Sequence, residues 1–242
     1  MRFRALATDY DGTIAYDGHV DDDTVAALRR VRDAGLQLIM VTGRELTDLF
    51  NTFEHADLFD RIVAENGAVL YAPTTREIEV LAAAPPRALI DRLTHENIPL
   101  SVGHSIVATV EPHEQAVLAA IRDLELDWHV IFNKGSAMAL PSDVTKASGL
   151  RPALDAIGVT PQMTIAVGDA ENDLVFLRGC GLAVAVANAL QTVKDVADLV
   201  TAGARGAGVA ELVDCWLAGE LEAITCAVEG HAPCRATESE SS

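Results

Sequence analysis

The chain has 242 residues, a length that accommodates one large or two modest domains with a sizeable buried core. Half of the residues are hydrophobic and 22% are charged, a composition that excludes a disordered or fibrous chain. The 18 basic and 36 acidic residues give a net charge of -18, which argues against electrostatic binding to nucleic acid or to an anionic membrane.

The four cysteines are scattered late in the chain and form no CxxC pair, so neither a disulfide framework nor a structural zinc site is expected. The N-terminal apolar run is too short for a signal peptide, and no apolar run approaches the ~20 residues of a membrane span. These features predict a cytoplasmic protein with reduced thiols and no membrane partner.

Three short apolar segments are interpreted as buried parallel strands, because each one stops at a polar turn that contains glycine. They cover residues 3–8, 37–41 and 163–167. Helical periodicity follows the first strand over residues 23–34 and the third over residues 171–177. The alternation of strand and helix predicts an α/β fold built on a Rossmann-like parallel sheet.

Two polar runs in the first third of the chain receive structural interpretations. The run Asp21-Asp22-Asp23 stands where a helix needs an N-cap and first-turn acids, so capping is favoured over metal binding. Asn66-Gly67 lies between the apolar residues 62–64 and 69–71, a pattern typical of a hairpin with an Asn-Gly turn.

The order of predicted elements changes over residues 73–140 to strand, helix, strand, helix, strand and strand. The earlier alternation of strand and helix then resumes. We therefore expect one main domain over residues 1–72 and 141–218 with a small α+β module inserted at 73–140. Residues 219–242 are acidic and rich in serine, which predicts a flexible tail. Its candidate metal ligands, Cys226, His231 and Cys234, are too scattered to predict a site.

Polar side chains stand at the ends of the predicted strands and at the start of one helix. In an open parallel sheet, ligands bind in the crevice outside the carboxyl ends of the strands, so these residues are expected to converge. They are Asp9, Asp11, Thr42, Lys146, Asp169 and Asp173.

This group of residues suits phosphate chemistry. The carboxylates would repel one another unless a hard cation lay between them, and oxygen-only ligation suits Mg²⁺. Thr42 and the backbone amides beside it can donate to a phosphate, while Lys146 supplies a positive charge to a transferring phosphoryl group. An aspartate can then act as the nucleophile. Singly, each of these residues would be an ordinary turn or surface residue.

Four ordered segments resemble the motifs of the haloacid dehalogenase-like (HAD) phosphatase superfamily, and the similarity covers residues 2–217. The segments are Asp9-Tyr10-Asp11-Gly12-Thr13, Val41-Thr42-Gly43, Lys146, and Gly168-Asp169-Ala170-Glu171-Asn172-Asp173. The place of the insertion, Glu65-Asn66-Gly67 and Val186-Ala187-Asn188-Ala189 are similar to the Cof-type (IIB) branch with a C2B cap. The short cap resembles that of archaeal-type phosphoglycolate phosphatases.

The resemblance assigns a role to each matching residue. It implies that Asp9 is the nucleophile and that Asp11 is the general acid and then the general base. It further implies phosphate binding by Thr42, Gly43 and Lys146, with Asn172 supporting the site. The implied metal ligands are Asp9, Asp11 through its carbonyl, Asp169 and Asp173. Substrate contacts from the cap loops are expected from Asn133 and Lys134, with His104 and Ser136 as further candidates.

The resemblance thus implies a Mg²⁺-dependent phosphatase that hydrolyses a small phosphate monoester through an aspartyl-phosphate. The substrate is expected to be a small phosphorylated metabolite, either phosphoglycolate or a sugar phosphate. Two alternatives remain: a phosphomutase, which shares the aspartate pair, and a module that binds a phosphorylated ligand without catalysis. The sequence does not predict the oligomeric state.

Overall fold

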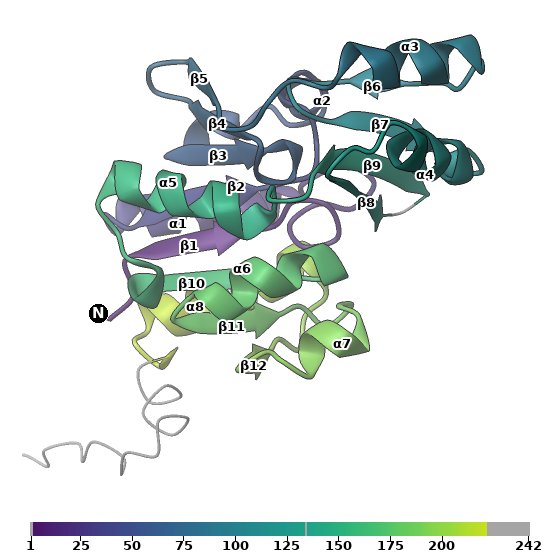
Figure 1. The fold of residues 1–242 in the computed structure, drawn as a ribbon. Coiled ribbons are helices and arrows are strands. Elements are labelled where there is room, and N and C mark those ends of the chain that lie inside the picture. Colours follow the sequence, from purple (N-terminus) through teal and green to yellow (C-terminus); the bar gives the residue numbers. More distant parts are fainter. Residues whose placement is uncertain (1, 134, 222–242) are drawn as a thin grey trace, which may run out of the picture.

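The computed structural model describes residues 2–133 and 135–221 (Figure 1). Most of the predicted tail, including Cys226, His231 and Cys234, lies outside these residues, as do Lys134 and the side chain of Asn133. Within the described ranges, every helix is too short or too polar to cross a membrane.

A large sheet of eight strands confirms the predicted α/β fold. Its order is β12-β11-β10-β1-β2-β3-β4-β5, and neighbours from β12 to β3 run parallel. The strands are β1 (Ala5–Thr8), β2 (Gln37–Val41), β3 (Arg61–Ala64), β4 (Val69–Ala72), β5 (Glu77–Val80), β10 (Thr164–Gly168), β11 (Leu182–Ala185) and β12 (Leu199–Val200).

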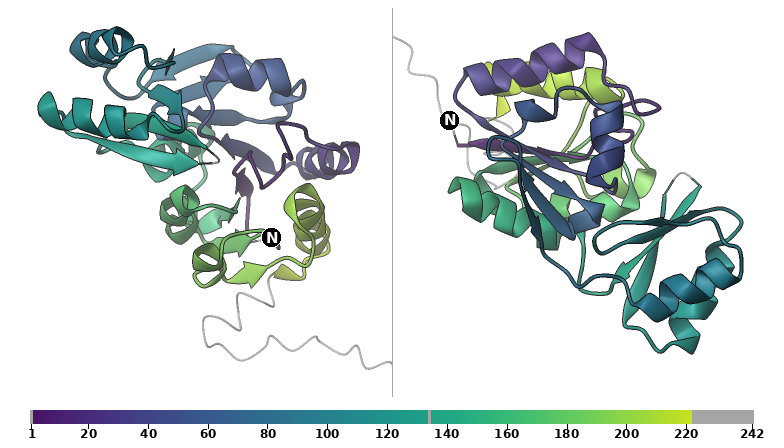
Figure 2. Two further views of the ribbon diagram at one scale, coloured as in Figure 1. Left: turned by 90° about the vertical axis from the view of Figure 1, so that its right-hand side faces the viewer. Right: turned by 90° about the horizontal axis from the view of Figure 1, so that it is seen from above.

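Helices cover both faces of this sheet, as Figures 1 and 2 show. One face carries α1 (Asp22–Asp33) and α8 (Arg205–Leu217), which pack on each other, and the other carries α5 (Lys146–Ile157) and α6 (Leu174–Gly179). Two short helices, α2 (Leu46–Thr52) and α7 (Gln191–Lys194), follow β2 and β11. Short 3-10 turns cover Ala56–Leu58, Glu65–Gly67, Pro161–Met163 and Glu171–Asp173.

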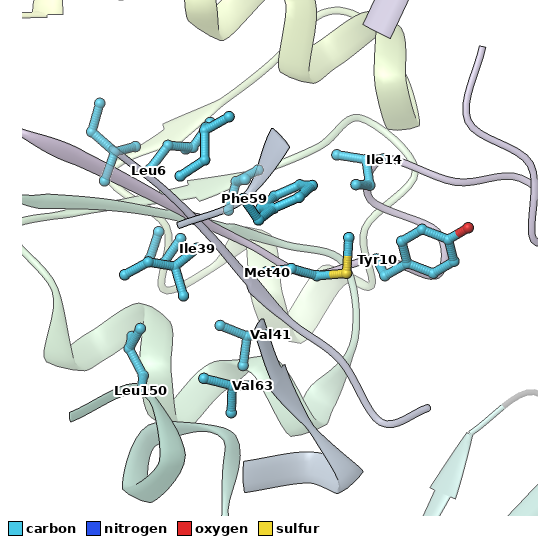
Figure 3. Close-up of a cluster of buried hydrophobic side chains, with 14 of the residues drawn as sticks. Leu6, Tyr10, Ile14, Ile39, Met40, Val41, Phe59, Val63 and Leu150 are labelled. Atoms are coloured by element: carbon cyan, nitrogen blue, oxygen red, sulfur yellow. The ribbon is translucent and has the colours of Figure 1, made fainter. Parts of the chain in front are cut away.

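The main core lies between the central strands and these helices (Figure 3). All four residues of β1 are buried because side chains on both faces of a covered parallel strand point into apolar surroundings. Leu6, Ile39, Val63 and Leu150 belong to this cluster. This packing holds the central strands in place, and the strands in turn fix where the loops at their carboxyl ends begin.

A smaller antiparallel sheet lies beside the carboxyl edge of the large one (Figure 2). Its strands, in the order β6-β7-β9-β8, are β6 (Ser101–Val102), β7 (Val107–Val110), β9 (Ser136–Pro141) and β8 (Trp128–Asn133). Helices α3 (Arg87–His95) and α4 (Glu114–Asp123) pack on it around a separate core that includes Leu89, Leu93 and Val117.

Of two local interpretations from the sequence, the helix cap is confirmed and the hairpin is confirmed without its predicted turn. The side chain of Asp21 caps α1 by accepting a hydrogen bond from the Thr24 backbone N–H at 2.7 Å. Strands β3 and β4 pair antiparallel, as the predicted hairpin requires, but residues 65–68 join them through the 3-10 turn Glu65–Gly67 instead of a two-residue Asn-Gly turn.

One strand joins a different sheet from the one that its place in the sequence indicated. Residues 77–81 fell within the inserted module, but β5 pairs antiparallel with β4 in the large sheet. All four residues of β5 are exposed, so it is an edge strand whose sequence carries little information about its partner. The small sheet contains only strands that follow it.

Candidate active site

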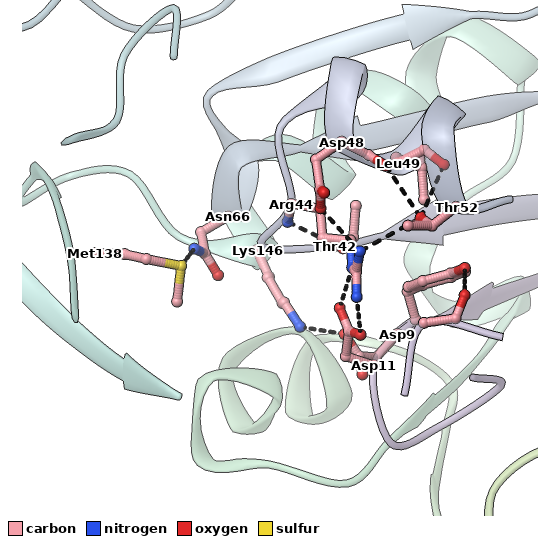
Figure 4. A network of polar contacts seen from close by, with 12 residues as sticks. Asp9, Asp11, Thr42, Arg44, Asp48, Leu49, Thr52, Asn66, Met138 and Lys146 are labelled. Carbon is pink, nitrogen blue, oxygen red and sulfur yellow. Dashed lines mark hydrogen bonds and ion pairs between the residues drawn. The ribbon is translucent and has the colours of Figure 1, made fainter. Parts of the chain in front are cut away.

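The predicted site residues converge at the carboxyl edge of the large sheet (Figure 4). Asp9 follows β1, Thr42 follows β2, Asp169 follows β10, and Lys146 begins α5. Strands β2 and β10 flank β1 in parallel register, and the Asp9 backbone N–H donates to the Val167 carbonyl at 3.0 Å. The strand order therefore places side chains from distant parts of the sequence around Asp9.

A buried ion cluster forms the floor of the site. The Lys146 ammonium lies 2.5 Å from Asp9 Oδ1 and 2.6 Å from Asp173 Oδ1, and its side chain is 2% exposed. Carboxylate oxygens of Asp9, Asp169 and Asp173 all lie within 4.8 Å of one another. Thr13 also donates its hydroxyl to Asp169 at 3.3 Å. Three buried carboxylates thus lie close together, and one buried ammonium contacts two of them.

This imbalance of charge affects proton binding. Burial and the charge of Asp173 raise the pKa of the Asp9 carboxyl from 3.8 to about 8, although Lys146 opposes the rise. Burial alone would lower the pKa of Lys146, but the charges of Asp173 and Asp9 raise it. A bound divalent cation would relieve the repulsion, and an all-oxygen donor set fits a hard cation.

Both carboxylate oxygens of Asp173 have protein partners. Oδ1 contacts Lys146, and Oδ2 accepts the backbone N–H groups of Asp169 at 2.9 Å and Ala170 at 3.0 Å. Asp173 therefore holds the loop after β10 in place and fixes the ammonium. Direct metal ligation by Asp173 stays a prediction.

Asp11 is paired with Arg44, a residue that sequence reasoning missed. The guanidinium donates to both Asp11 oxygens, at 2.7 and 2.8 Å, and also to Asp48 at 2.8 Å (Figure 4). Its carbon lies 5.3 Å from the centre of the Tyr10 ring. The signal was its position directly after Thr42-Gly43, where the matched motif stopped.

Thr42 is fully buried behind the site. Its hydroxyl oxygen accepts the Arg44 backbone N–H at 3.1 Å, and its carbonyl accepts that of Asn66 at 3.0 Å. Gly43 lines the cavity, and a Cβ there would lie 3.0 Å from the Asn66 amide nitrogen. The glycine therefore lets Asn66 approach closely. Asn66 in turn accepts a hydrogen bond from the Asn172 side chain at 3.1 Å.

Sequence reasoning gave Glu65 no role at the site, because the run around it was used only as a turn and as part of the Cof-type resemblance. It is 1% exposed and has a positive φ of 49°. Its carboxylate accepts the backbone N–H groups of His104 and Ser105, both at 2.9 Å, and lies 3.1 Å from His104 Nδ1. A buried acid in the large domain thus holds a loop of the small sheet.

Helix α5, which carries Lys146, packs against the turn at Glu65–Gly67 through two glycines, Gly149 and Gly67. Gly67 has a φ of 116°, and a Cβ on Gly149 would lie 2.5 Å from the Gly67 Cα. No side chain fits between these two backbones, so the contact fixes the distance of α5 from the site.

The variant Gly149→Ala is expected to destabilise the protein by about 1–3 kcal/mol, because backbone atoms must shift to admit the methyl group. This cost outweighs the gain in helix propensity of about 1 kcal/mol. A lower melting temperature and slower turnover would be measured. The matched control is Gly179→Ala, whose Cβ would meet no atom within 4 Å. Equal melting temperatures for the two variants would contradict the role of this contact.

A cavity of about 990 Å³ opens above the ion cluster, and both sheets contribute to its wall. From the large domain come Asp9, Asp11 and Asp169, among others, and from the small sheet Ala108 and Ser136, among others. Of the cap candidates, Ser136 thus faces the cavity, whereas His104 contacts Glu65. Asn133 and Lys134 carry their side chains outside the described residues.

Comparison with known proteins agrees with this geometry. A profile described as haloacid dehalogenase-like hydrolase matches residues 6–105 and 105–213. The chain belongs to this family. HAD phosphatases generally use a divalent metal, and the buried acidic cluster is suited to hold one.

Relatives within the HAD family match the chain over nearly its full length. A phosphoglycolate phosphatase of Methanothermobacter thermautotrophicus is 33% identical, covering 87% of this chain and 97% of its own. Phosphoglycolate phosphatase 1 of Saccharolobus solfataricus is 27% identical, with 91% and 99% covered. Among solved structures, a HAD subclass IIB sugar phosphatase has a TM-score of 0.71 at 20% identity, with 88% and 98% covered. The structural likeness supports the HAD fold.

Proposed function

We propose that the chain is a Mg²⁺-dependent phosphatase that hydrolyses a small phosphate monoester through an aspartyl-phosphate on Asp9. The observation that carries this proposal is the buried contact of Asp9 with Lys146 at the floor of a cavity, in a member of the HAD hydrolase family. Asp9 and Asp169 would hold the Mg²⁺, which when bound supplies positive charge that offsets the phosphoryl oxygens.

The first half-reaction transfers the phosphoryl group to the protein. Lys146 engages Oδ1 of Asp9, so we assign the attack on phosphorus to Oδ2. The phosphorus–oxygen bond of the ester breaks, and the leaving alkoxide takes the proton of Asp11. Arg44 donates to both Asp11 oxygens, so Asp11 must leave Arg44 and take up a proton from water before the first turnover, and each second half-reaction returns that proton.

The second half-reaction regenerates Asp9. Asp11 accepts a proton from water, the water oxygen attacks the phosphorus, and the bond to the Asp9 carboxylate breaks. We assign the binding of the phosphoryl oxygens to the Thr42 hydroxyl, the Gly43 backbone N–H and Lys146, with Asn172 supporting the turn through Asn66.

We assign the small sheet and its two helices to a substrate-selecting cap that begins after β5 and ends with β9. Its contribution to the cavity wall supports this assignment. The named relatives suggest two substrate classes, phosphoglycolate and sugar phosphates. A volume of about 990 Å³ accommodates either class.

A panel of phosphate esters tests the proposal, with phosphate release and isomerisation followed separately in the presence of Mg²⁺. Release of inorganic phosphate from small monoesters is the expected result. Isomerisation without release would identify a phosphomutase instead. Tight binding of a phosphorylated metabolite with neither reaction would identify a module without catalysis.

A further inference from the structure

Two cationic side chains line the described part of the catalytic cavity, and they differ in their partners. Arg44 is committed to Asp11 and Asp48. Arg205 forms no ion pair with any residue in the described ranges. Its guanidinium carbon instead lies 4.3 Å from the centre of the Tyr16 ring, which lines the same cavity. A stacked guanidinium keeps its N–H edge available for an anion.

The backbone of Arg205 is held in a fixed position relative to the loop after β1, which carries Asp9 and Asp11. Its N–H donates to Asn188 Oδ1 at 2.7 Å, and Asn188 Nδ2 donates to the Gly12 carbonyl at 2.8 Å. Arg205 also has a positive φ of 52°, which a residue with a side chain rarely adopts. A side chain on the next residue, Gly206, would collide with Thr24 Oγ1 at 2.0 Å, so the start of α8 is held closely. The surroundings thus enforce a strained position for this cation.

The charge of the cavity wall indicates what kind of group Arg205 binds. The other charged residues of its wall, apart from Arg44, are acids: Asp9, Asp11, Asp17, Glu45, Asp48 and Asp169. A substrate with a second negative group would be repelled by this wall unless a cation with free donors received that group. The planar fork of arginine suits a carboxylate, which it can bind through two parallel hydrogen bonds.

We propose that Arg205 binds a carboxylate on the leaving group of the substrate, with Tyr16 holding the guanidinium in place. This inference rests on the proposed phosphatase function and narrows its substrate class to phosphate monoesters that carry a carboxylate. Arg205 is the specificity-determining residue, and Tyr16 and Asn188 are positioning residues.

The test compares two esters of similar size, phosphoglycolate and 2-hydroxyethyl phosphate, which differ in carrying a carboxylate or a neutral hydroxymethyl group. In Arg205→Gln, kcat/KM for phosphoglycolate is expected to fall about 10- to 100-fold, as for the loss of hydrogen bonds to a charged group, while that for the neutral ester stays nearly unchanged. Tyr16→Leu is expected to give a smaller loss with the same selectivity. Arg151→Gln, an exposed arginine on α5, is the matched control. Equal losses on both esters, or none on phosphoglycolate, would overturn the proposal.

A binding measurement separates this inference from the proposed function. In an Asp9→Asn background, calorimetry with Mg²⁺ gives the Kd of each ester without turnover. Arg205→Gln is expected to raise the Kd of phosphoglycolate and to leave that of the neutral ester unchanged. A selective loss of binding would support the carboxylate site even if the native chain released no phosphate, whereas unselective binding would refute it in an active phosphatase.

Discussion

Asparagine in place of Asp9 is expected to reduce phosphate release by at least about 10⁴-fold, because the amide oxygen is a poor nucleophile toward phosphorus. The substitution keeps the size of the side chain and an oxygen that can accept from Lys146, which lies 2.5 Å from Oδ1. Stability should therefore not fall with activity. Intact-protein mass spectrometry after acid quenching should show a phosphorylated native chain and no phosphorylated Asp9→Asn.

The variant Asp11→Ala distinguishes the nucleophile from the acid. Its alkyl-ester turnover is expected to fall about 10² to 10⁴-fold, the usual contribution of a general acid and base. An aryl phosphate needs little protonation to leave, so its first step should be spared more than the second. A burst of phenol followed by slow turnover, with phosphate trapped on Asp9, is the expected trace. Persistent turnover by Asp9→Asn, with neither burst nor trapped phosphate in Asp11→Ala, would reverse the assignment.

Removal of divalent metal is the second change with a very large expected effect. Chelator-treated protein is expected to lose essentially all turnover and to regain it with Mg²⁺, because three buried carboxylates lie close together and the Lys146 ammonium contacts two of them. Mg²⁺ should also raise the melting temperature, since a ligand that binds the folded state stabilises it.

Asp169→Ala should abolish both the recovery of turnover and the rise in melting temperature that Mg²⁺ causes. It should not lower the melting temperature of the metal-free protein, because the substitution removes one of three carboxylates that repel one another. The control is Glu171→Ala, which removes an exposed acid from the same loop and should retain both responses. Full activity in chelator, or a normal Mg²⁺ response from Asp169→Ala, would contradict the metal site.

The parallel strands were predictable because a covered strand is apolar throughout and ends at a polar turn. Residues that follow such strands lie at one edge of the sheet, and this alone predicts that Asp9, Thr42 and Asp169 lie close together. The start of a helix at Lys146 was also predicted. These features are local in sequence and need only the rule that parallel strands share a carboxyl edge.

The features that were not predictable depend on contacts between distant residues. Arg44 reaches Asp11 across 33 positions, and Glu65 reaches Ser105 across 40. Nothing beside Glu65 in the sequence distinguishes a buried acid from a solvated one in a turn. The short exposed strand β5 likewise gave no sign of which sheet it would join. Burial and pairing of these residues are decided by the assembled fold.

The contact between Glu65 and the loop at His104 and Ser105 has a consequence for exchanging caps between relatives. A grafted cap must present two backbone N–H groups to Glu65, because an unpaired buried carboxylate is strongly destabilising. It must also carry glycine at position 103, where a Cβ would lie 2.6 Å from Glu65 Oε1. The boundary for exchanging caps therefore includes this side-chain contact as well as the two connecting segments. A chimaera that does not preserve the contact would leave Glu65 without its partners.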